Sequence, residues 1–405
     1  MQRAASAVRR AAEWSGAANA RCRARGRAVC APVESVNVSV QELAALRAKF
    51  PVRQDWTDEQ IRAVYKQPLM QLIYAGASAH RAYFTPGEVQ RCTLLSIKTG
   101  GCSEDCSYCS QSSKYKTSVK AEKLMDEEPV LRAAAEAKAA GSTRFCMGAA
   151  WRGVSSVGKG QFSRVLGMIS KVRAMDLEVC ATLGMVNEEQ ARALKEAGLT
   201  AYNHNIDTSE AYYPRVITTR TFEDRLRTLR AVRSAGLSVC CGGIIGLGES
   251  ENDRISMLCT LASQASHPES VPINALVANE GTPLEDAEPL EPWSLVRMIA
   301  TARIVMPASM VRLSAGRNSL SKTEQALCFM AGANSIFTGD KLLTTPNVEQ
   351  NEDDALFEAL GLRGKKPFGN EAQRAREHQQ ERRRVSKDVR REAYEEELVL
   401  ASSSA

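Results

Sequence analysis

Residues 92–109 read CTLLSIKTGGCSEDCSYC, a strand-like apolar run that passes into a polar loop holding Cys102, Cys106 and Cys109. Further short apolar runs follow, separated by longer alanine- and leucine-rich segments of helical period. With residues 92–100, the candidate strands are residues 143–149, 177–184, 201–207, 237–246, 271–278, 309–316 and 334–340. This alternation predicts an α/β fold, a parallel (β/α)8 TIM-type barrel over residues 85–366, with a doubly wound open sheet as the alternative. The cysteine loop then lies at the end of the barrel where active sites form.

The segments on either side of the barrel differ from it in composition. Residues 37–84 are predicted to be helical, with residues 57–84 forming two helices broken at Pro68. Residues 367–405 are charge-dense and predict a helical or disordered tail. Residues 1–36 are rich in arginine and alanine with few acids, which is typical of an organelle transit peptide, and a disordered basic tail is the alternative. Arginine outweighs serine there, which favours the mitochondrial matrix over the chloroplast, with processing expected between residues 28 and 40.

Bulk composition excludes some classes of function. The chain has 405 residues, 44 % of them hydrophobic, and a mean hydropathy of -0.28, so we expect a globular protein without membrane spans. The net charge of +6 is concentrated at the N-terminus, so no nucleic-acid partner is expected. In a reducing matrix the twelve cysteines are expected to be free thiols or metal ligands.

Three kinds of site compete for Cys102, Cys106 and Cys109. A structural zinc site would need a fourth cysteine or histidine, and no matching motif recurs nearby. A ferredoxin-like carrier would supply four cysteines to its cluster. A cluster with three protein ligands leaves one iron open to bind and react with another molecule, and this interpretation suits a loop at a barrel mouth.

The C-x3-C-x2-C spacing, with Tyr108 before the last cysteine, resembles the signature of the radical S-adenosylmethionine (SAM) superfamily. Seven blocks between residues 57 and 365 further resemble the biotin synthase family: LLSIKTGGCSEDCSYCSQSSKY, TRFCMGAAWR, YNHNIDTS, VCCGGIIGLGE, ESVPINALV, VRLSAGR and CFMAGANSIFTGDKLLTTPN. The resemblance implies that Cys102, Cys106 and Cys109 hold a 4Fe-4S cluster. The amino and carboxylate groups of SAM would then bind the remaining iron.

Three isolated cysteines, Cys146, Cys180 and Cys240, fall on the second, third and fifth predicted strands, where one inward-facing layer of a barrel could gather them. Each alone would be an ordinary buried cysteine. The resemblance implies that together they bind a 2Fe-2S cluster, with Arg312 as the fourth ligand. From the residues alone, a buried Arg312 paired with a carboxylate is the alternative.

Three further cysteines are expected to pack away from this layer. Cys241 should point outward, because neighbouring residues of a strand face opposite sides. Cys259 and Cys328 are expected to pack among the helices.

Polar residues near the strand ends complete the predicted site. Asn205 and Asp207 are expected on one face of the fourth strand, opposite a packed His204. By resemblance, Asn205 and Asp207 bind the SAM ribose. By resemblance, Asn203, Asn205 and Asn274 line the dethiobiotin pocket. Arg225, at the start of the helix after the fourth strand, is predicted to pair with the SAM carboxylate, and Ile244 to contact the adenine. Tyr108 is a further predicted SAM contact.

The resemblance implies a radical SAM sulfurtransferase that inserts sulfur between two unactivated carbons of dethiobiotin, chemistry that needs a cofactor radical. The 2Fe-2S cluster would be the sulfur source. It further implies a reductase or ferredoxin as electron donor, the iron-sulfur assembly machinery as partner, and a homodimer. Two other interpretations stay open: another radical SAM enzyme acting on a small molecule, and a non-catalytic iron-sulfur protein.

Overall fold

The computed structural model describes residues 39–339 and 341–366, and the predicted transit peptide (1–36) and charged tail (367–405) lie outside them. The chain divides into two units, Met1–Glu42 and Leu43–Ala405. In the first unit, only residues 39–42 are described. There the Glu42 backbone N–H donates to the Ser39 hydroxyl (3.1 Å) at the start of helix α2 (Val40–Lys49).

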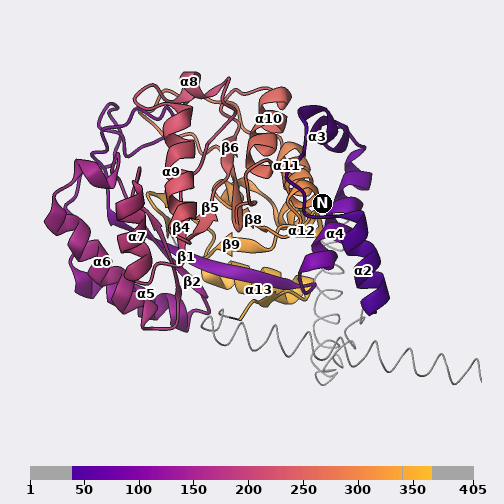
Figure 1. Cartoon of the computed structure of the whole chain (residues 1–405), viewed down its shortest axis with the longest axis horizontal. Coiled ribbons are helices and arrows are strands. Elements are labelled where there is room, and N and C mark those ends of the chain that lie inside the picture. Colours follow the sequence, from indigo (N-terminus) through magenta and orange to yellow (C-terminus); the bar gives the residue numbers. More distant parts are fainter. Residues whose placement is uncertain (1–38, 340, 367–405) are drawn as a thin grey trace, which may run out of the picture. The chain divides into compact units, whose positions relative to one another are not determined.

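The second unit is built around a closed parallel barrel (Figure 1). Its strands are β1 (Glu88–Lys98), β2 (Arg144–Ala149), β3 (Glu178–Thr182), β4 (Ala201–Asn203), β5 (Ser238–Cys240), β6 (Gly243–Ile245), β7 (Ser270–Ala275), β8 (Met310–Leu313) and β9 (Ser335–Phe337). They pair in the order β1-β2-β3-β4-β5-β7-β8-β9, and β9 pairs again with β1. β6 continues β5 and pairs with β7. The β1–β9 pairing closes the ring, which confirms the barrel and excludes the open sheet.

Helices alternate with the strands and cover the barrel (Figure 1). They are α5 (Glu127–Ala139), α6 (Lys159–Arg173), α7 (Glu188–Glu196), α8 (Tyr213–Val216), α9 (Phe222–Ser234), α10 (Glu251–Ala262), α11 (Pro292–Val305) and α12 (Lys322–Met330). Four of these begin with a capping box in which a polar side chain accepts from the third backbone N–H of the helix; the caps are Asn187, Thr221, Ser250 and Ser321. Each box ends a strand-to-helix loop at a defined residue.

Helices α3 (Asp58–Tyr65) and α4 (Leu69–Tyr83) follow α2 in the chain and come before β1, and Pro68 is the N-cap of α4. The predicted break at Pro68 is therefore confirmed. No helix in the described part of the chain has both the length and the apolar character needed to cross a bilayer.

The structure corrects two strand predictions. The fourth strand ends at Asn203 and not at residue 207, so Asn205 and Asp207 lie in the following loop. The expected alternation of these residues along a strand face is wrong, because the backbone turns at Asp207 (φ +69°) to pair with Gly243. The fifth strand breaks into β5 and β6 between Cys240 and Gly243.

The end of the predicted barrel region also contains elements that the sequence patterns did not indicate. β10 (Lys341–Leu342) and β11 (Thr345–Pro346) form a short antiparallel hairpin, and α13 (Gln350–Leu360) follows. β12 (Arg363–Gly364) then pairs in parallel with the start of β1. The described residues beyond β9 therefore end with a strand that pairs with the barrel.

Candidate active site

One cavity of about 330 Å³ opens into the barrel from the carboxyl ends of its strands. Its lining includes every site residue predicted from the sequence: Cys102, Cys106, Tyr108, Cys109, Cys146, Cys180, Asn203, Asn205, Asp207, Arg225, Cys240, Ile244, Asn274 and Arg312. The fold therefore brings together side chains that lie up to 210 positions apart, between Cys102 and Arg312. Two sets of cysteines face this one space.

The first set lies on the loop after β1. Burial raises the pKa of Cys106 to about 12 and also raises those of Cys102 and Cys109. Free thiols there would stay protonated at neutral pH, whereas binding to iron would stabilise the thiolates. No three His, Cys, Asp or Glu side chains within residues 39–339 and 341–366 are arranged to hold a single metal ion. Three thiolates in one loop could each bind a different iron of a polynuclear cluster.

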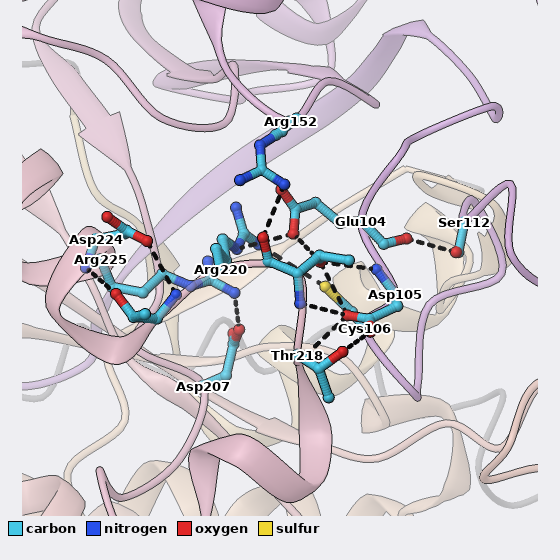
Figure 2. Close-up of polar contacts among 12 residues, drawn as sticks. Glu104, Asp105, Cys106, Ser112, Arg152, Asp207, Thr218, Arg220, Asp224 and Arg225 are labelled. Atoms are coloured by element: carbon cyan, nitrogen blue, oxygen red, sulfur yellow. Dashed lines mark hydrogen bonds and ion pairs between the residues drawn. The ribbon is translucent and has the colours of Figure 1, made fainter.

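A charged network fixes this loop, as Figure 2 shows. The buried Glu104 carboxylate lies 3.3 Å from Arg152 and 3.7 Å from Arg220, and it accepts from the Thr219 hydroxyl. Arg220 also places Nη2 3.8 Å from Cys106 Sγ. The arginines offset the carboxylate charge in this buried position, so the cysteine loop does not carry an unpaired anion.

The neighbouring Asp105 ties the loop to residues before α9. Its Oδ1 accepts backbone hydrogen bonds from Thr218 (2.9 Å) and Thr219 (3.1 Å) (Figure 2). Although partial burial opposes it, hydrogen bonds from the hydroxyl and the backbone N–H of Thr218, and then from those of Thr219, lower the pKa of Asp105 to about 2. Glu104, Asp105 and Arg220 were not among the site residues predicted from the sequence. The spacing of Glu104 and Asp105 between two cluster cysteines is the signal that could have found them.

Asp207 and Arg225 form a buried ion pair on one wall of the cavity. Asp207 Oδ2 also accepts from the Tyr108 hydroxyl (3.0 Å), and Arg225 Nε donates to the Tyr213 hydroxyl (2.9 Å). This links the cysteine loop to the loop after β4. Burial holds the pKa of the adjacent His204 well below its ordinary value, so His204 is neutral as well as packed.

The three predicted asparagines line the cavity and are already part of its hydrogen-bond network. Asn203 Nδ2 donates to Asn205 Oδ1 (3.1 Å) and lies 3.3 Å from Cys240 Sγ. Asn205 Oδ1 also accepts from the Gly242 backbone N–H (3.2 Å). Asn274, on β7, donates to the carbonyl of Gly243, the first residue of β6 (2.9 Å). These bonds fix the orientation of each amide toward the cavity.

The second set of cysteines forms a buried layer inside the barrel, below the loop. It holds Cys92, Cys146, Cys180 and Cys240 with Ala201, and Leu94 and Phe337 pack against it. Cys146 and Cys180 are register partners on β2 and β3. Hydrogen bonding with Cys146 and then burial raise the pKa of Cys180. The inward gathering predicted for three cysteines is observed, and the layer contains a fourth, Cys92.

Arg312 reaches this layer from β8 and is fully buried. Its Nη2 lies 3.4 Å from Cys92 Sγ and its Nη1 3.7 Å from Cys240 Sγ. Among the described residues it forms no ion pair with a carboxylate. Although burial opposes its charge, the thiols nearby keep the pKa of Arg312 above its ordinary value. A buried layer of thiols beside a guanidinium fits an iron-sulfur cluster, whose usual protein ligands are thiolates.

Cys241 and Cys328 lie buried in the main hydrophobic core outside this layer, and Cys259 is partly buried on α10. The prediction that they pack away from the site is confirmed. At the base of the barrel, Arg144 pairs with Glu178 (2.8 Å), a buried ion pair that the sequence analysis did not identify.

Known proteins resemble this chain both in sequence and in fold. The model of the radical SAM superfamily matches residues 96–259, and that of the biotin and thiamin synthesis associated domain matches residues 272–363. A crystal structure of methylornithine synthase superposes with a TM-score of 0.67 at 17 % identity, covering 80 % of this chain and 97 % of that one, which is a likeness of fold alone. The barrel with its cysteine loop is thus that of a radical SAM enzyme.

Curated relatives narrow the class. The mitochondrial biotin synthase of Arabidopsis thaliana is 62 % identical over 320 residues, which cover 79 % of this chain and 84 % of the relative. The biotin synthase of Schizosaccharomyces pombe is 54 % identical over 332 residues, covering 81 % and 91 %. The chain belongs to the biotin synthase family of radical SAM sulfurtransferases.

Proposed function

We propose that this chain inserts sulfur into dethiobiotin to form biotin. The observation that carries the proposal is that the three loop cysteines and three cysteines of the buried layer, Cys146, Cys180 and Cys240, line the same cavity. A radical SAM enzyme that only isomerises or methylates its substrate has no use for the second set. A non-catalytic iron-sulfur protein has no use for the cavity between them.

The cysteines supply the two metal-binding sets. Cys102, Cys106 and Cys109 would hold a 4Fe-4S cluster, and Cys146, Cys180 and Cys240 would hold a 2Fe-2S cluster with Arg312 as the fourth ligand. When bound, the first cluster with SAM supplies the one-electron chemistry that activates unreactive carbon, and the second supplies sulfide. The buried walls of the barrel exclude water from the space between them.

The remaining residues would orient the two small molecules. Asn205 and Asp207 would bind the SAM ribose, Ile244 would contact the adenine, and Asn203 and Asn274 would hold dethiobiotin together with Asn205. Tyr108 and Arg225 both bind Asp207, so they keep its carboxylate in one position. Arg225 would also face the carboxylate of SAM, which is a charge-assisted interaction in a buried wall.

We further propose a mitochondrial location, supported by the mitochondrial relative and by the arginine-rich composition of residues 1–36. The expected partners are a reductase or ferredoxin that donates electrons, the matrix machinery that rebuilds the second cluster, and a second copy of the chain.

Anaerobic reconstitution tests the function. The chain should bind about six irons, four in one cluster and two in the other. With dithionite, SAM and dethiobiotin it should form both 5′-deoxyadenosine and biotin.

Cys180→Ala should lower the iron content to about four and abolish biotin while some SAM cleavage remains. Cys328→Ala, which removes a buried thiol outside the cavity, is the matched control. Cleavage of SAM by the unaltered chain with about four irons and no biotin would refute the proposed reaction.

A further inference from the structure

Each of the three nitrogen atoms of the Arg312 guanidinium has a partner. Nε donates to Ser335 Oγ (3.0 Å), and Nη2 lies 3.4 Å from Cys92 Sγ. The third, Nη1, lies 3.7 Å from Cys240 Sγ, a long contact. The group also packs over the ring of Phe337, with Cζ 4.7 Å from the centroid. Nη1, which has the longest of the three contacts, is therefore the nitrogen that faces Cys240, one of the proposed cluster ligands.

Cys92 contacts Arg312 from across the junction between β9 and β1, where the barrel closes. It lies on β1 and is the register partner of Phe337 on β9, the strand that closes the ring. Its side chain is fully buried, and its Sγ lies 3.7 Å from Ser335 Oγ. The Ser335 hydroxyl donates in turn to Gln90 Oε1 (3.4 Å). Cys92 and Ser335 thus form one polar clamp on an arginine that emerges from β8.

An arginine side chain has many rotamers. Contacts with neighbouring residues must fix the orientation of the guanidinium plane before the group can face a metal centre or an anion in one geometry. Resting on the function proposed above, we propose that Cys92 is a positioning residue for the second cluster. Its thiol and the Ser335 hydroxyl fix the Arg312 guanidinium so that Nη1 faces Cys240 and the cluster space. In this role Cys92 accepts a hydrogen bond from Arg312 and does not bind iron.

The test compares Cys92→Ser and Cys92→Ala in the reconstituted full chain, with Cys328→Ala as a control for loss of a buried thiol. Iron and sulfide contents, Mössbauer spectra and the rate of second-cluster loss under dithionite are measured. Cys92→Ser keeps an acceptor and should match the unaltered chain. Cys92→Ala should keep about six irons, change the spectrum of the two-iron centre, and lose that centre about tenfold faster, because a hydrogen bond to a charged group is lost.

Ser335→Ala provides a second variant, because it removes the other half of the clamp and should change the same spectral component. Spectra and loss rates of Cys92→Ala and Ser335→Ala that equal those of Cys328→Ala would overturn the proposal. Loss of the two-iron centre in both Cys92→Ser and Cys92→Ala would also overturn it, because that pattern marks an iron ligand. Only about four irons in the unaltered chain would instead show that the proposed function itself is wrong.

Discussion

At the scale of single residues, charge near the cysteine loop is set by a few buried side chains. Arg220 touches both Glu104 and Cys106, so one guanidinium offsets a carboxylate and faces a cluster thiol. Arg152 pairs with the same carboxylate, but within the described residues it forms no hydrogen bond with a cysteine, and its side chain is 39 % exposed against 7 % for Arg220. Replacing each arginine in turn therefore distinguishes the electrostatic effect of pairing with Glu104 from that of contacting Cys106 Sγ.

Arg220→Gln should lower the reduction potential of the first cluster, because a cation near a cluster favours the reduced, more negative state. Loss of one charge-assisted hydrogen bond predicts a shift on the order of 60 mV, equivalent to about 1.4 kcal/mol for a one-electron couple. Titration followed by electron paramagnetic resonance measures it. Arg152→Gln is the matched control and should shift the potential less. Equal shifts in the two variants would assign the effect to Glu104 and not to the contact with Cys106.

His80 on α4 predicts a dependence of stability on pH. Burial lowers its pKa to about 3, so the folded chain keeps it neutral, whereas the unfolded chain protonates it near pH 6.5. The unfolded state therefore binds more protons between these values, and stability falls as the pH is lowered through this range. In urea unfolding of the metal-free chain, this residue should contribute up to about 1.4 kcal/mol per pH unit, and His80→Gln should flatten the profile by that amount. Parallel profiles for the two chains would contradict the assignment.

At the scale of elements, the site depends on where strands stop. Because β4 ends at Asn203 and β5 breaks before β6, the chain turns and brings Asp207 against Gly243. The break is enforced by close packing: a Cβ at Gly242 would lie 1.9 Å from the Pro272 carbonyl oxygen. Apolar patterning predicted both segments as strands, because it detects burial and β-branched residues and does not detect a close approach between backbones.

Gly242→Ala should therefore be strongly destabilising. The added methyl group meets backbone and not a movable side chain, so we expect a loss of about 3 kcal/mol or more in the free energy of unfolding. Gly160→Ala is the control, because a Cβ at Gly160 on α6 meets nothing within 4 Å, and alanine there should stabilise by about 0.5–1 kcal/mol. Urea unfolding measures both. A Gly242→Ala chain as stable as the unaltered one would show that the close packing of Gly242 against Pro272 does not enforce the break between β5 and β6.

At the scale of the whole described barrel, the C-terminal elements hold the seam between β9 and β1. Asp353 on α13 binds Arg317, which follows β8, and both side chains are buried (Nη2–Oδ2, 2.9 Å). Asp354 pairs with Arg91 on β1 (2.7 Å), and Arg91 also lies over the ring of Phe357. The seam is thus covered by a helix that neither the strand patterns nor the cysteine motif indicated.

Removing one partner of the buried pair should leave an uncompensated charge. Asp353→Ala is expected to destabilise the chain by about 3–5 kcal/mol, whereas the double change Arg317→Met with Asp353→Leu should recover much of that loss. Chemical unfolding of the single and double variants measures both changes in the free energy of unfolding. A single variant within about 0.5 kcal/mol of the unaltered chain would show that α13 does not depend on this pair.

Sequence alone determined the parallel barrel, the helix break at Pro68, the cysteine loop and the cysteines that face inward, because strand periodicity and cysteine spacing are local properties of the chain. Only the tertiary structure decided which distant charges pair. Examples are Glu104 with Arg220, Asp207 with Arg225, and Arg312 with Cys92. Those contacts depend on barrel shear, on strand ends and on the closing β1–β9 register, and each of these is set by packing between segments far apart in the sequence.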